Sequence, residues 1–95
     1  LRKLGYLTLD ENNITDLSPL SELRRLYSVS LAGNPVSDLQ PLESCRKIEW
    51  LDLGGTQILD FSSLAHFPLL YSLDLSRKRI YNINYTRIFE IIQQS

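Results

Sequence analysis

Residues 26–42 read LYSVSLAGNPVSDLQPL, in which apolar positions surround a single asparagine, Asn34. The same pattern recurs when the sequence is shifted by 22 residues in either direction. The matching positions are Leu4, Leu7, Leu9, Asn12, Ile14, Leu17 and Leu20 upstream, and Ile48, Leu51, Leu53, Thr56, Ile58, Phe61, Leu64, then Leu70, Leu73, Leu75, Lys78, Ile80 and Ile83 downstream. A fixed period of this length is typical of a solenoid, in which equivalent residues of successive coils stack on each other.

Each repeat contains two kinds of local pattern. Leu7 and Leu9 flank Thr8, and this alternation predicts a short strand whose leucines point into the coil. The following apolar residues are spaced by three, which favours a tight helical turn, and Ser18-Pro19 places a proline at its start. One repeat alone cannot bury these side chains, because its neighbours supply the opposing surfaces.

The pattern resembles the leucine-rich repeat family over nearly the whole chain. The segments DLSPL (16–20) and DLQPL (38–42) are similar to the 22-residue repeats of bacterial internalins, and the short repeats of eukaryotic phosphatase regulators are also similar. The resemblance implies an α/β solenoid that coils as a right-handed superhelix. A parallel sheet would form its concave face, with short helical or 3-10 turns and loops on the convex face.

Asn12 and Asn34 are polar residues within this apolar pattern. In the family, this asparagine turns inward and bonds the backbone of its own and adjacent coils in a ladder. An amide has both donors and an acceptor, so it can satisfy backbone groups where the chain bends away from a strand. Thr56 can take over part of this role through its hydroxyl, whereas Lys78 is expected to end the ladder.

The repeats divide a single domain, residues 1–95, into units of about 1–22, 23–45, 46–67 and 68–89. Residues 90–95 either begin another repeat or belong to a terminal helix that closes the core. The chain lacks methionine and begins within a repeat, from which we expect it to be a fragment of a longer polypeptide. It would lie at the cell surface or be secreted if internalin-like, and in the cytoplasm if of the phosphatase-regulator type.

Composition argues against several functional classes. The net charge of −1 gives no overall field for nucleic acid, and no apolar run is long enough for membrane insertion. The sequence has no nucleophile elbow, P-loop, metal-binding cluster or dinucleotide fingerprint, so we expect no enzyme activity, no metal and no cofactor. The single cysteine, Cys45, is expected to be a small buried apolar residue. Asp16, Asp38 and Asp60 are expected to cap turns.

The strand positions that point outward form the predicted binding surface. Trp50 is its expected centre, because tryptophan on an exposed strand has no core to fill and is enriched at binding hot spots; the alternative is a ring that only shields the sheet. The remaining candidates are Tyr6, Thr8, Asp10, Ser28, Ser30, Asp52, Ser72, Asp74 and Arg77. The acidic residues would suit a partner presenting Lys or Arg around an apolar centre, although ordinary solvent-exposed polarity also explains them.

The resemblance implies a non-enzymatic module that binds a protein on its concave sheet face. The alternative is a structural spacer, or a segment that associates weakly with itself through its repeat ends, within a longer array. Basic pairs at 2–3, 24–25 and 46–47 form a further column, which we interpret as solvated surface because no aromatic residues are interleaved.

Overall fold

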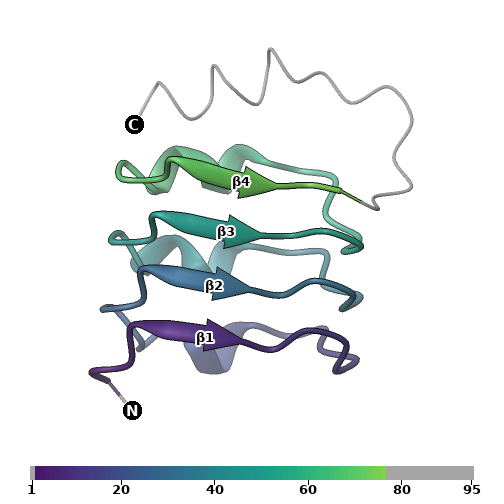
Figure 1. The fold of residues 1–95 in the computed structure, drawn as a ribbon, viewed down its shortest axis with the longest axis horizontal. Coiled ribbons are helices and arrows are strands. Elements are labelled where there is room, and N and C mark those ends of the chain that lie inside the picture. Colours follow the sequence, from purple (N-terminus) through teal and green to yellow (C-terminus); the bar gives the residue numbers. More distant parts are fainter. Residues whose placement is uncertain (1, 77–95) are drawn as a thin grey trace.

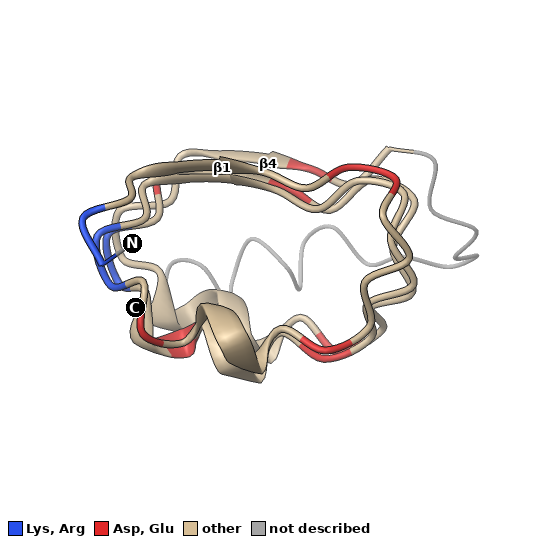
Figure 2. Cartoon of the chain, turned by 90° about the horizontal axis from the view of Figure 1, so that it is seen from below, with Lys and Arg blue, Asp and Glu red and all other residues tan. Residues whose placement is uncertain are grey.

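The chain folds into a stack of coils, seen here in a computed structural model that describes residues 2–76 (Figure 1). Its elements are β1 (Tyr6–Thr8), η1 (Ser18–Leu20), β2 (Ser28–Ser30), η2 (Gln40–Ser44), β3 (Trp50–Asp52), η3 (Ser62–His66) and β4 (Ser72–Asp74), where η denotes a 3-10 helix. The strands form one sheet in the order β1-β2-β3-β4. Figure 2 shows the sheet on one side of the coils and the 3-10 turns on the other, which confirms the predicted solenoid architecture.

The register of the sheet follows the sequence period. All three strand pairs are parallel, and Val29 pairs with Leu51, which in turn pairs with Leu73. Each residue therefore meets its counterpart 22 positions away, as the repeat predicts.

The core is a column of apolar side chains shared between coils. Fully buried positions include Leu26, Val29, Leu31, Val36, Leu42, Ile48, Leu51, Leu53, Ile58, Leu64 and Phe67. In the first coil, by contrast, Leu4, Leu7, Leu9, Ile14 and Leu20 are only partly buried against this cluster. Most apolar positions are thus fully buried only where a coil lies on both sides, as expected of a solenoid; Leu17 of the first coil, at 1% exposure, is the exception.

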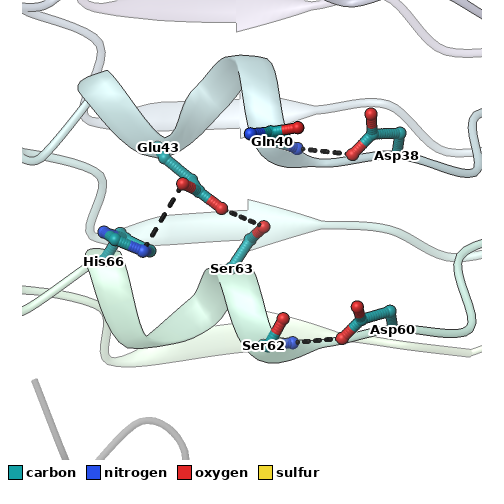
Figure 3. Close-up of polar contacts among 7 residues, drawn as sticks. All are labelled: Asp38, Gln40, Glu43, Asp60, Ser62, Ser63 and His66. Atoms are coloured by element: carbon teal, nitrogen blue, oxygen red, sulfur yellow. Dashed lines mark hydrogen bonds and ion pairs between the residues drawn. The ribbon is translucent and has the colours of Figure 1, made fainter.

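An aspartate precedes each 3-10 turn and fixes its start. Oδ1 of Asp16, Asp38 and Asp60 accepts a hydrogen bond of 2.9 Å from the backbone N–H two residues later (Figure 3 shows the last two). η1 and η2 also have a proline in the first turn, whereas η3 has none. The carboxylate bond is common to all three turns, so the turn forms in the third coil without proline.

Asn34 joins the first two coils at the ends of their strands. Its Oδ1 accepts the N–H groups of Asn12 (2.8 Å) and Ile14 (3.0 Å), and its Nδ2 donates to the carbonyls of Leu9 (2.8 Å) and Leu31 (2.9 Å). The Asn12 amide donates only to carbonyls of its own coil. Thr56 Oγ1 donates to the carbonyl of Leu53 at 2.7 Å. This bond is equivalent to the one that Asn34 donates to Leu31 in the preceding coil.

The column Glu11, Gly33, Gly55 lies in the turn that follows each strand. All three residues have positive φ angles of 60°, 75° and 69°. This left-handed conformation favours glycine, so the two glycines are explained by the backbone of the turn.

Several expectations lie outside the described residues: the roles of Arg77 and Lys78, and the alternatives for residues 90–95. The repeat boundaries stay predictions. Within residues 2–76, no helix has both the length and the apolarity that crossing a membrane requires.

Candidate protein-interaction surface

The outer face of the sheet presents stacked columns of side chains. Tyr6, Ser28, Trp50 and Ser72 are paired residue by residue across the strands, and so are Thr8, Ser30, Asp52 and Asp74. Equivalent strand positions lie about 4.8 Å apart. A partner that docks here would therefore meet side chains at fixed spacing on a hydrogen-bonded backbone.

The two serines of β2 are less accessible than the sequence suggests. Ser28 is only 8% exposed and Ser30 only 3%. Both are small and lie between bulkier residues of the adjoining coils, and the Ser30 hydroxyl donates to Asp10. The accessible part of the predicted surface consists of Tyr6, Thr8, Asp10, Trp50, Asp52, Ser72 and Asp74, of which Trp50, Asp52 and Ser72 are half-buried.

The acidic residues of this face also hold the turns that follow the strands. Asp10 Oδ1 accepts the Ala32 N–H of the next coil at 3.2 Å. Asp52 accepts the N–H of Gly54 at 2.9 Å, and Asp74 that of Ser76 at 2.8 Å. These bonds fix the position of each carboxylate, so any charge that a partner meets on this face is already oriented.

A second outward column, which the sequence interpretation missed, lies one residue before the strands. Tyr27, Glu49 and Tyr71 occupy it, together with Gly5 in the first coil. Their backbones continue the ladder: Tyr27 N–H donates to the Gly5 carbonyl, Glu49 to Tyr27, and Tyr71 to Glu49, at 2.8–3.0 Å. The signal was present in the sequence, because residues 27, 49 and 71 share the 22-residue period.

These two columns enclose an open hollow of about 380 Å³, here called the aromatic hollow. Its lining consists of Tyr6, Tyr27, Ser28, Glu49, Trp50 and Tyr71. Gly5 leaves room for the Tyr27 ring, since a Cβ at Gly5 would approach ring atom Cε2 to 2.6 Å. The structure thus places Trp50, the residue singled out from the sequence, beside three tyrosines and one carboxylate.

Basic residues gather at a different place, at the end of the coils where the chain enters the strands (Figure 2). Arg2, Lys3, Arg24 and Arg25 line a shallow depression there together with Glu22. The depression has no aromatic lining, and stacked bases or sugars need such platforms. The solvated-surface interpretation therefore still fits this column.

A Ser–Glu–His cluster on the opposite side of the coils has the wrong order for nucleophilic catalysis. Glu43 accepts the Ser63 hydroxyl at 2.7 Å and lies 3.4 Å from His66 Nε2 (Figure 3). A catalytic serine must bond to the histidine that removes its proton, but here the carboxylate lies between the two. The cluster joins η2 to η3. Among residues 2–76, no group of three or more His, Cys, Asp or Glu side chains is arranged to hold a metal ion.

Cys45 is fully buried in the core, and its thiol lies 3.7 Å from the carbonyl oxygen of Leu20. Burial raises the pKa of this thiol above its usual value of 9.0. Because the thiolate is the reactive form of cysteine, Cys45 is a packing residue rather than a nucleophile.

The turn aspartates make stability depend on pH. The Ser18 backbone N–H, followed by its hydroxyl, lowers the pKa of Asp16 below 3.8, and Ser62 acts in the same way on Asp60. A carboxyl whose pKa is lowered by folding stabilises the protein above its unfolded pKa, and this contribution is lost as pH falls through the folded pKa. Asp16→Asn with Asp60→Asn should therefore lower the melting temperature at pH 7, and this difference from the wild type should shrink as pH falls below 3.8 through the lowered pKa values of the two carboxyls. A difference in melting temperature between the variant and the wild type that stays constant from pH 7 to the lowest pH measured would contradict this prediction.

Comparison with known proteins agrees with this geometry. A family model described as leucine-rich repeats (2 copies) matches residues 2–44. Internalin C2 of Listeria monocytogenes is 36% identical, with a TM-score of 0.80 over 87% of this chain and 37% of that chain. A second Listeria internalin, InlF, is 26% identical, with a TM-score of 0.62 over 98% of this chain and 33% of that chain. No curated protein sequence matches significantly.

The chain is therefore a leucine-rich repeat protein. Its 22-residue repeats are similar to those of the Listeria internalins, and it spans about a third of the length of these two structures.

Proposed function

We propose that this domain binds a protein partner on the outer face of its sheet, without catalysing a reaction. Leucine-rich repeat folds are commonly protein-interaction modules and are typically non-enzymatic. The observation that supports the assignment to this face is the aromatic cluster. Tyr6, Tyr27 and Tyr71 are 60%, 48% and 77% exposed, and they lie around Trp50 in one hollow. Aromatic side chains of this kind are enriched at binding hot spots.

The mechanism is rigid presentation. Side chains on paired strands have little freedom to lose when a partner docks, so less of the interaction energy is spent on ordering them. The carboxylates of Asp10, Asp52 and Asp74 lie on the same face as the aromatic cluster, outside the hollow, and are held in place by backbone hydrogen bonds. This arrangement suits a partner whose docking surface carries positive charge.

Trp50→Ala should weaken partner binding by roughly thirtyfold, about 2 kcal/mol, because a half-buried hot-spot ring is removed from the centre of the interface. The partner, once identified by affinity capture with this domain, is purified and titrated by calorimetry. Leu59→Ala is the control: it truncates an exposed apolar residue in the connection between β3 and η3. Equal affinity of the Trp50→Ala and Leu59→Ala proteins would show that the partner does not use this face.

The first coil supports a second candidate function, self-association or a spacer role within a longer array. Its Leu9, Ile14, Leu17 and Leu20 surround an almost entirely apolar depression beside Asp16 and Pro19. Another coil stacked there would bury the exposed parts of Leu9, Ile14 and Leu20, whereas Leu17 is already buried. Sedimentation velocity at increasing concentration separates the alternatives, since reversible dimers that are abolished by Ile14→Asp would favour self-association over recognition by the sheet.

A further inference from the structure

We propose that the aromatic hollow binds the guanidinium group of an arginine side chain presented by the protein partner. This inference rests on the proposed function and specifies the chemistry that the partner must supply. The hollow combines four aromatic rings with one carboxylate: Tyr6, Tyr27, Trp50 and Tyr71 supply the rings, and Glu49 the negative charge.

In the part of the chain that the structure describes, the charge of the hollow has no counterpart. Glu49 is the one charged residue among the described lining residues, and it is half-buried. Within the described range, 2–76, no lysine, arginine or histidine makes an ion pair with the Glu49 carboxylate. A purely apolar occupant would remove water from this carboxylate without replacing its interactions, which is unfavourable. A cation would neutralise it.

The aromatic lining favours the same kind of occupant. A cation over the face of Trp or Tyr is attracted by the ring quadrupole, and arginine makes this contact more often than lysine. Guanidinium is planar, stacks on aromatic rings and is less strongly hydrated than an ammonium group, while its N–H donors can bond a carboxylate with two parallel hydrogen bonds. A guanidinium group can therefore use both chemical features of the hollow: it stacks on the aromatic rings and donates hydrogen bonds to the Glu49 carboxylate.

The hollow is built on fixed backbone positions. Tyr27, Glu49 and Tyr71 are joined by hydrogen bonds along the coils, and Tyr27 lies over Gly5. Its volume of about 380 Å³ lies toward the lower end of the range of ligand pockets. It is therefore suited to one side chain rather than to a large ligand.

The fluorescence of Trp50 reports binding to the hollow directly, because Trp50 is the single tryptophan of the chain. Nα-acetyl-arginine amide is titrated while tryptophan fluorescence is followed, and Nα-acetyl-citrulline amide serves as the neutral probe of nearly the same shape. We expect saturable binding of the arginine probe in roughly the millimolar range, with the citrulline probe about tenfold weaker. Equal binding of the two probes, or no binding of either, would overturn the proposal.

Two matched charge-neutralising variants locate the site. Glu49→Gln should weaken the arginine probe about tenfold, whereas Asp74→Asn, on the same face but outside the hollow, should change it by less than about twofold. Equal effects of the two substitutions would indicate only a general acidic surface and would contradict the proposal.

The same variants separate this inference from the proposed function. With the purified partner, Glu49→Gln should weaken binding about tenfold and lysine substitution of the contacting partner arginine should do the same. If Trp50→Ala weakens the partner but Glu49→Gln does not, the face binds protein and the arginine site is wrong. If the probe binds but Trp50→Ala leaves the partner unaffected, the site stands as a cation site and the proposed interface is wrong.

Discussion

Asn34→Ala is expected to lower the free energy of unfolding by about 2–4 kcal/mol, because it removes the acceptor of two backbone N–H groups from another coil. The Asn12 and Ile14 N–H groups both bond to Asn34 Oδ1. The carbonyls that Asn34 contacts are less affected: Leu9 O also accepts from Asn12 Nδ2, and Leu31 O from the backbone N–H of residue 34 itself. The two N–H groups therefore dominate the loss.

The matched control for this prediction is Asn12→Ala. Asn12 occupies the same place in the preceding coil, but it is exposed and its amide bonds only its own coil. Its substitution should cost about 1 kcal/mol or less. Urea unfolding of both variants, followed by circular dichroism, measures the difference. Equal losses would mean that Asn34 does not connect the coils.

Leu51→Ala should be still more destabilising, by about 3–5 kcal/mol, because it leaves a cavity in the middle of the shared core. Leu51 is fully buried in β3 and pairs with residues of β2 and β4. Neighbouring coils on both sides restrict the collapse of this cavity.

Leu59→Ala removes the same atoms from a residue that is 75% exposed, and it should change stability by less than about 0.5 kcal/mol. Denaturant unfolding of the two leucine variants compares them directly. Comparable destabilisation would contradict the assignment of residues to the interior and the surface.

The fold could be predicted because the repeat constrains it many times. A single alternation such as Leu7-Thr8-Leu9 is a weak indicator of a strand, but its recurrence at the same period in four coils fixes both the strands and their register. Backbone partners for Asn34 could be expected on a different ground, since a polar residue inside an apolar pattern needs them. Its cross-coil bonds are seen only in the structure.

The surface was less predictable, because exposure depends on the neighbouring columns. Ser28 and Ser30 point outward from β2 and are nevertheless buried. Tyr27, Glu49 and Tyr71 were missed because strand alternation assigns a residue adjacent to an outward position to the opposite face. At the beginning of β2 and β3, two consecutive N–H groups donate to one carbonyl of the preceding coil, and both residues line the hollow. Part of the candidate site therefore follows from this departure from regular strand pairing, which the apolar pattern does not encode.

The central claim is that the interior is shared by residues 22 positions apart. Methyl nuclear Overhauser spectroscopy on protein labelled at valine and leucine tests it most directly. The account predicts cross-peaks from the methyl groups of Leu51 to those of both Val29 and Leu73, which pair with it in the sheet. Methyl groups of these three residues that contact unrelated parts of the chain, and not each other, would contradict it.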